Sequence, residues 1–138
     1  FVTYKSQSAQ QHMPWVAMAP ETRLLYSSNY DNVTAIQIYN EDLEYVRDLK
    51  IDTVLYKVQG GAFYEGLLYL GVNGGDTVFA VDVNSGAVTT ALVQTETGSD
   101  AEYEFEGITF LDLREKGMGL MHNTGIFTKL LTKNWLFV

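Results

Sequence analysis

Cysteine is absent from the 138 residues of this chain, and histidine and proline occur only twice each. Without cysteine the chain can form no disulfide, no thiolate metal site and no thiol nucleophile. Two histidines are too few for a zinc site of the standard type, which draws its ligands mainly from cysteine and histidine. The chain also lacks a run of about 18 apolar residues, so no segment is expected to span a membrane.

Basic residues are scarce as well. Nine Lys and Arg stand against 17 Asp and Glu, which gives a formal net charge of −8. A nucleic acid or an anionic membrane surface attracts a basic patch, so neither partner is expected here. The chain begins at Phe1 rather than Met and shows no signal-peptide pattern, which indicates a processed, trimmed or partial chain. These features do not fix the compartment, and our working expectation is a secreted or periplasmic protein.

The most informative feature that is present is an approximate internal repeat. Trp15, Gly61 and Gly107 are spaced 46 residues apart, and the segments around them start alike. Within the first two units, the Leu-Leu-Tyr sequence at 24–26 recurs at 67–69. A period of roughly 40–50 residues made of short strands is typical of a β-propeller, in which each repeat forms one four-stranded blade.

We therefore predict a single all-β domain over residues 1–138, folded as a β-propeller or a partial propeller with about three four-stranded blades. The blades are expected at residues 12–51, 58–93 and 106–138, and the last strand of the first blade at Tyr45–Leu49. Clusters of Asn, Asp and Gly between the apolar runs are typical of tight hairpin turns. An all-β sandwich would use the same strands, and the equal spacing of the units favours the propeller.

Three blades are fewer than the four to eight of known propellers, so an arc of three would leave two sheet faces open. We expect a second copy of the chain, or the missing remainder of a propeller, to cover these faces. The predicted partner for these faces is therefore another sheet of the same kind, and a small molecule or a protein is compatible as a separate ligand.

Two segments resemble known propeller families. Residues 78–88, in which a strand ending at Asp82 leads into a Ser-Gly turn, resemble the repeat of quinoprotein-like propellers. The Glu-Gly-Ile-Thr sequence at 106–109 is similar to the start of an inner strand in six-bladed gluconolactonase-like and phytase-like esterase propellers. In the gluconolactonase-like family that glutamate binds a divalent metal at the central channel, so the resemblance implies that Glu106 is a metal ligand.

The inner strands of a propeller line a channel, and the mouth of the channel is the usual binding site. The repeat places three polar residues, His12, Gln59 and Glu106, at the start of the inner strands, and these are the candidate ligand-binding residues. Glu106 is also the candidate metal ligand, and Ca²⁺ suits it because calcium prefers oxygen ligands.

Three functions are compatible with these features. The first is a non-catalytic binding or interaction module with its site at the channel mouth. The second is a metal-dependent hydrolase of the lactonase or phosphoesterase kind with Glu106 as a metal ligand. The third is a structural subunit that completes a propeller by self-association, and fold class alone does not choose among the three.

Overall fold

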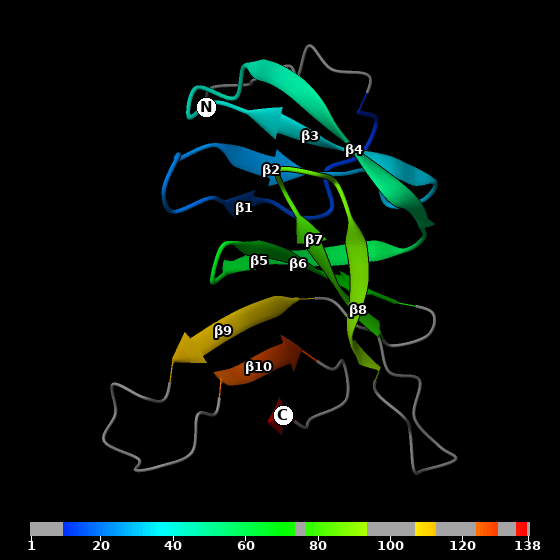
Figure 1. Cartoon of the computed structure of the whole chain (residues 1–138), viewed down its shortest axis with the longest axis vertical. Coiled ribbons are helices and arrows are strands. Elements are labelled where there is room, and N and C mark those ends of the chain that lie inside the picture. The colour runs from blue at the N-terminus through cyan, green and yellow to red at the C-terminus, as the bar shows by residue number, and fades with distance from the viewer. Residues whose placement is uncertain (1–9, 74–76, 94–106, 113–123, 130–134, 138) are drawn as a thin grey trace.

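The computed structural model describes residues 10–73, 77–93, 107–112, 124–129 and 135–137, and over these ranges every regular element is a β-strand (Figure 1). The strands form three antiparallel sheets that follow one another along the chain. The first sheet contains β1 (Ala17–Met18), β2 (Leu25–Ser27), β3 (Val33–Tyr39) and β4 (Tyr45–Leu55). The second contains β5 (Val58–Tyr64), β6 (Leu67–Val72), β7 (Thr77–Asp82) and β8 (Val88–Val93). The third contains β9 (Ile108–Asp112), β10 (Thr124–Lys129) and β11 (Trp135–Phe137).

The prediction of an all-β chain is thus confirmed. Among the described residues, none belongs to a helix that could cross a membrane. In each sheet every strand pairs with its neighbour in sequence, which makes each sheet a meander. Meanders need only short connections, and this agrees with the polar turn clusters between the apolar runs.

Side chains fix two of these turns in the first sheet. In the β3–β4 turn, the Asn40 Oδ1 atom accepts hydrogen bonds from the backbone N–H groups of Asp42 and Glu44, at 3.0 and 2.8 Å. In the β1–β2 turn, Arg23 has a positive φ of 58° and donates from Nε and Nη2 to the Glu41 carboxylate, both at 2.6 Å. The same ion pair lowers the pKa of Glu41, chiefly through its hydrogen bond with Arg23.

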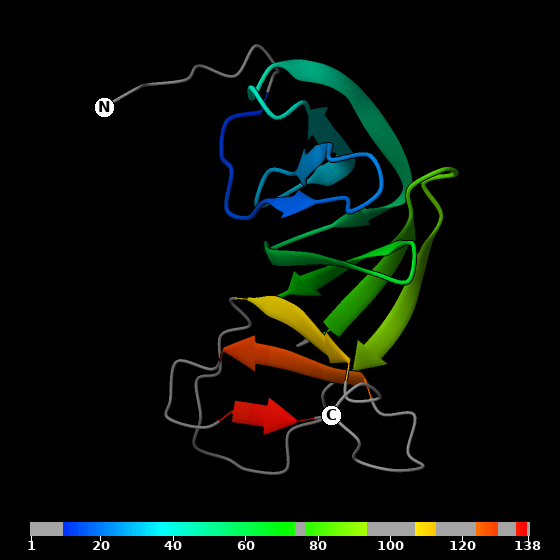
Figure 2. The same ribbon diagram turned by 90° about the vertical axis from the view of Figure 1, so that its left-hand side faces the viewer.

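The three sheets are stacked in chain order, with β1 against β5 and β5 against β9 (Figures 1 and 2). The larger core lies between the first and second sheets, where aromatic and branched aliphatic side chains interdigitate. Across this core the rings of Tyr26 and Phe63 meet edge to face, with centroids 5.0 Å apart. The most deeply buried aliphatic side chains of this core are Val33, Ile36, Ile38, Val58, Leu68, Leu70 and Val81.

A smaller core joins the second and third sheets. Phe110 of β9 stacks on Tyr64 and meets Tyr69 at an angle, with centroids 4.7 Å apart in both pairs. Val78 and Ile108 are buried beside these rings. Partial burial raises the pKa of Tyr69 above its usual range, which keeps that phenol neutral.

The first and second sheets approach each other closely at Trp15 and Gly61. The Trp15 ring lies against the Gly61 backbone, so that a Cβ atom added at Gly61 would be 2.3 Å from Trp15 Cε3. The indole Nε1 donates to Ser28 Oγ at 2.9 Å, which holds the ring in place. Trp15 and Gly61, which the 46-residue spacing treats as equivalent, are therefore in contact with each other across the core.

The observed register explains this contact. Ala17 pairs with Tyr26 in the first sheet, and Ala62 pairs with Tyr69 in the second. Aligned on these two pairs, the residue that corresponds to Gly61 is Val16, one position after Trp15. Because successive side chains of a strand alternate between faces, a shift of one residue moves the tryptophan to the opposite face.

The outer strand β4 is fastened to the turn between β7 and β8. The Asp52 backbone N–H donates to the Gly86 carbonyl at 3.1 Å, and the Asp52 carboxylate accepts from the Val88 backbone N–H at 3.1 Å. Gly86 is buried and has a φ of 78°, which few residues other than glycine adopt. The first and second sheets are therefore joined at their outer strands as well as at their inner ones.

Candidate functional site

The N-terminal ends of β1 and β5 meet at the turn between β2 and β3. The backbone N–H groups of Gln11 and His12 donate to Asn29 Oδ1 at 3.0 and 3.2 Å. The Val58 N–H, at the start of β5, donates to the Tyr30 carbonyl at 2.9 Å. One turn thus positions the segments that precede both inner strands.

A hydrogen-bond network ties Gln10 to β2 and β3 of the first sheet. Gln10 Nε2 donates to Ser27 Oγ at 2.9 Å and to the Ser28 carbonyl at 2.8 Å, and the Tyr39 hydroxyl donates to Gln10 Oε1. Ser27 Oγ in turn donates to the Trp15 carbonyl at 2.6 Å. Since the polar groups of Ser27 and Ser28 are buried and have partners in this network, the network stabilises the fold.

The structure describes two of the three candidate site residues that the sequence predicts. His12 is exposed in the segment before β1, and Gln59 is half-buried near the start of β5. The Gln59 amide nitrogen lies 3.5 Å from the Tyr30 hydroxyl. The structure therefore puts His12 and Gln59 at the same end of neighbouring inner strands. Glu106 lies outside the described residues, so its role stays a prediction.

The described candidate residues do not supply a calcium site by themselves. Over the ranges that the structure covers, no three His, Asp or Glu side chains cluster in a way that could hold a metal ion. Between them, His12 and Gln59 offer one side-chain carbonyl oxygen, whereas Ca²⁺ takes six to eight oxygen ligands. The prediction of a calcium site thus depends on Glu106 and on oxygen ligands from further residues around it.

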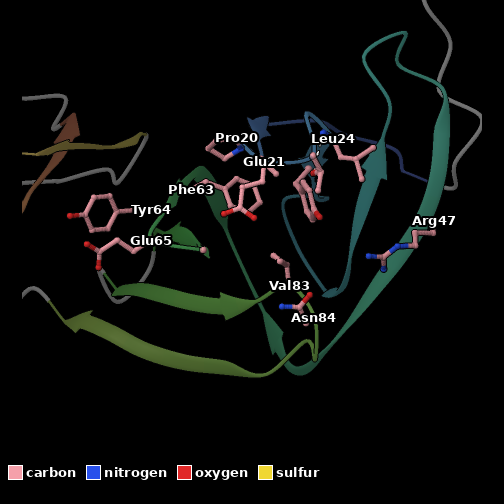
Figure 3. Close-up of a pocket in the computed structure, with 13 residues that line it drawn as sticks. Pro20, Glu21, Leu24, Arg47, Phe63, Tyr64, Glu65, Val83 and Asn84 are labelled. Atoms are coloured by element: carbon pink, nitrogen blue, oxygen red, sulfur yellow. Dashed lines mark hydrogen bonds between the residues drawn. The ribbon is translucent and has the colours of Figure 1, made fainter.

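A pocket of about 610 Å³ lies between the first and second sheets at the other end of the inner strands (Figure 3). The β1–β2 turn forms one wall, the β5–β6 turn another, and Arg47 of β4 lies opposite. Val83 and Asn84, which follow β7, close the remaining side. This volume is within the usual range of small-molecule pockets, roughly 300–1,000 Å³.

Apolar side chains form the inner surface of this pocket. Leu24, Tyr26, Phe63 and Val83 line it, and all four belong to or pack against the main core. Because the rings of Tyr26 and Phe63 are fixed against each other, the surface is already formed without a ligand. A flat apolar group could stack on it without rearrangement of the core.

Charged side chains stand above this apolar surface. In Figure 3, Glu21 and Arg47 extend toward the open space of the pocket from opposite sides, whereas Tyr64 and Glu65 lie at its far end and extend away from it. Both Glu21 and Arg47 are exposed. The pocket thus presents one carboxylate and one guanidinium to an occupant.

The turn that carries Val83 and Asn84 is held by the carboxylate of Asp82. The Asn84 backbone N–H donates to Asp82 Oδ1 at 2.8 Å. This bond, together with one from the Ser85 side chain, lowers the pKa of Asp82 because both favour its charged form. The Ser-Gly turn noted in the sequence therefore serves to position one wall of the pocket.

The pocket lies at the opposite end of the inner strands from His12 and Gln59, the described candidates that the sequence predicted. His12 and Gln59 precede or begin these strands, whereas the pocket is built by the turns that follow them. The available signal was weak: Phe63 precedes a Glu-Gly turn, and Tyr26 follows a polar turn. Such aromatic residues beside turns are common in sheets, and only the packing of two sheets turns them into a pocket.

The pocket contains none of the usual catalytic pairs among its described residues. Its lining has no histidine, serine or lysine, and its two carboxylates do not converge in Figure 3. General acid–base or nucleophilic catalysis requires a reactive group within hydrogen-bond reach of a base or acid. The arrangement suits binding by stacking and by charge-assisted hydrogen bonds.

Comparisons with known proteins add little to these observations. No protein-family model matches the chain, and no curated protein matches it either. Among solved structures, the chain is similar to the crystal structure of the computationally designed Ika4 protein, at 11% sequence identity and a TM-score of 0.45. That similarity covers 97% of this chain and 94% of the designed one. A similarity at this level carries no argument about fold or function.

Proposed function

We propose that this chain is a non-catalytic binding module built on an arc of a β-propeller. The architecture is supported by three antiparallel meanders in chain order, stacked so that β1 lies against β5 and β5 against β9. Successive blades of a propeller are arranged in this way around a central channel. The ligand site is the pocket between the first two sheets, at the mouth where the inner strands end.

The observation that carries the binding function is the preformed apolar surface beneath two exposed charges. Tyr26 and Phe63 are held in place by the core, so an occupant does not have to order them, and ordering side chains is one of the costs of binding. Glu21 and Arg47 supply polar contacts that orient an occupant. A few polar groups above an apolar surface are typical of small-molecule sites.

A pocket-filling variant tests this proposal. We expect phenol, indole, phenylacetate and benzylamine to give saturation-transfer NMR signals with the unmodified chain. Asn84→Trp should abolish these signals or weaken them at least about fivefold, because an indole at this exposed position fills the pocket. Thr53→Trp, at an exposed position outside the pocket lining, is the matched control and should leave the signals unchanged.

Two outcomes contradict the proposal. One is the absence of signal with all four probes at millimolar concentration. The other is an equal loss of signal in the Asn84→Trp and Thr53→Trp variants, which would locate binding elsewhere. Unchanged circular dichroism in both variants is the check that neither substitution disturbs the fold.

Self-association is a second candidate function, and a separate observation favours it. Val16, just before β1, and Met18 of β1 are apolar, yet they remain 54% and 46% exposed on the side that is turned away from the second sheet. In the register given above they correspond to Gly61 and Phe63, which face the first sheet. The face of the second sheet that carries Gly61 and Phe63 is thus covered by the first sheet. The matching face of the first sheet, with Val16 and Met18, has no such cover among the described residues, which supports a second copy of this chain as its partner.

The mass in solution tests self-association. We expect light scattering to give a mass of about two chains or more, and the double substitution Val16→Lys and Met18→Lys to reduce it to one chain, because two buried ammonium groups would oppose docking. Thr34→Lys with Thr53→Lys, at exposed positions in the same sheet, is the matched control and should leave the assembly intact. A mass of one chain for the unmodified protein at about 100 µM would contradict this candidate function, since an interface of standard size is stable at that concentration.

A further inference from the structure

We infer that the pocket between the first two sheets binds a small molecule that carries a cationic group and an anionic group at opposite ends of an apolar body. This inference rests on the proposed binding function and specifies the ligand class. It is carried by the positions of Glu21 and Arg47 on opposite sides of the pocket (Figure 3).

Neither charge is neutralised within the described part of the chain. The basic residue nearest to Glu21 in sequence is Arg23, and that guanidinium is held by Glu41 through two hydrogen bonds of 2.6 Å. The ion pair between Arg23 and Glu41 thus leaves the Glu21 carboxylate to an occupant of the pocket. Among the described residues, Arg47 likewise forms no ion pair.

The two charges lie on elements that the fold holds apart. Glu21 is in the β1–β2 turn, next to the inner strand, whereas Arg47 is in the outer strand β4. Arg47 pairs with Ile38 in the sheet register, so its side chain leaves β4 on the same face as the core residues. A ligand that contacts both charges must therefore extend across the pocket, over the apolar side chains between them.

These positions set the chemistry of the occupant. An ammonium or guanidinium group on the ligand would donate to the Glu21 carboxylate, and a carboxylate or phosphate would accept from the Arg47 fork. An aromatic or aliphatic middle part would lie on Tyr26 and Phe63. A metabolite with one charge would leave the other protein charge to solvent, so it should bind less tightly.

Three related probes separate these contributions. The compound 4-(aminomethyl)phenylacetate carries both charges on one ring, 4-methylphenylacetate lacks the ammonium, and 4-methylbenzylamine lacks the carboxylate. We expect the first to bind about three- to tenfold more tightly than either single-charge analogue, as measured by NMR titration, because each charged contact adds a modest favourable term.

Substitutions on the protein then assign each charge. Glu21→Gln should weaken the binding of the two amine-containing probes about three- to tenfold and leave 4-methylphenylacetate unchanged. Arg47→Gln should weaken the two carboxylate-containing probes to the same extent and leave 4-methylbenzylamine unchanged. Asp42→Asn and Lys50→Gln change the same charges at exposed positions outside the pocket lining and should have no effect.

The inference is overturned if the three probes bind equally well, or if Glu21→Gln and Arg47→Gln have no more effect than their controls. In that case the binding of the aromatic panel, and its loss in Asn84→Trp, still decides the proposed function by itself. Failure of both experiments would remove the binding function altogether.

Discussion

Replacing Gly86 with alanine is expected to lower the free energy of unfolding by about 3 kcal/mol, as measured by urea denaturation. Two costs combine in this value. The φ of 78° at Gly86 is unfavourable for any residue with a Cβ atom. In addition, the new Cβ would lie 2.0 Å from the Lys50 carbonyl oxygen, and a backbone atom of β4 cannot move aside as a side chain can.

Gly66→Ala is the matched control for this substitution. Gly66 has nearly the same φ, 81°, but a Cβ atom there would meet nothing within 4 Å. It should therefore show the conformational cost alone, about 1 to 2 kcal/mol. The difference between the two variants measures the contact between the β7–β8 turn and β4. Equal losses of unfolding free energy in Gly66→Ala and Gly86→Ala would contradict the close contact between Gly86 and the Lys50 carbonyl.

Replacing Gly61 with alanine is expected to lower the free energy of unfolding by about 2 to 3 kcal/mol. The added methyl group would lie 2.3 and 2.5 Å from Cε3 and Cζ3 of Trp15. The indole cannot simply tilt away, because its N–H is bonded to Ser28 Oγ at 2.9 Å and the ring is buried in the core. The sheets must separate slightly or this hydrogen bond must break.

Gly107→Ala is the control for Gly61→Ala. Gly107 has the same place in the 46-residue spacing, but a Cβ atom there would meet nothing within 4 Å. We expect a change within about 0.5 kcal/mol in urea denaturation. A double-mutant cycle with Trp15→Phe gives a further check, because the smaller ring should recover part of the loss if the clash causes it. A loss at Gly61 that is independent of the ring would contradict this account.

The strands and turns of this fold were predictable because their signals are local. Short apolar runs separated by Asn, Asp and Gly predict hairpins, and such a segment precedes β3, where Asp31 and Asn32 form the turn. The predicted length of β4 was wrong, because the strand runs to Leu55 and not to Leu49. Four of its last six residues are exposed, and two polar residues separate Ile51 from Val54, so no regular apolar alternation marked this part as strand.

The contacts between sheets were not predictable from local signals. Equal spacing suggested that Trp15 and Gly61 were equivalent, whereas the register offsets them by one residue and brings them into contact. A spacing counted along the chain cannot detect such an offset, since turns of different length change the count without changing the fold. Pairing between strands, and hence which face a residue occupies, is fixed only by the assembled sheet.

The same reason limited the prediction of the site. His12 and Gln59 were chosen because they begin the inner strands, and the structure does place them at one end of the stack. The pocket requires the β1–β2 turn, the β5–β6 turn and Arg47 to converge, and these are up to 47 residues apart, from Ala19 to Gly66. No short motif encodes a convergence of this kind.

The bonds between Asp52 and the β7–β8 turn have a consequence for the motions of the molecule. The N–H groups of Asp52 and Val88 are both bonded across the junction of two sheets, to Gly86 and Asp52 respectively, and not within a single ladder. Solvent can therefore reach these two amides when the sheets part at their outer strands, even while each sheet stays intact. Their rates of hydrogen exchange would report that parting, a slow opening of the stack that is distinct from the melting of any one sheet.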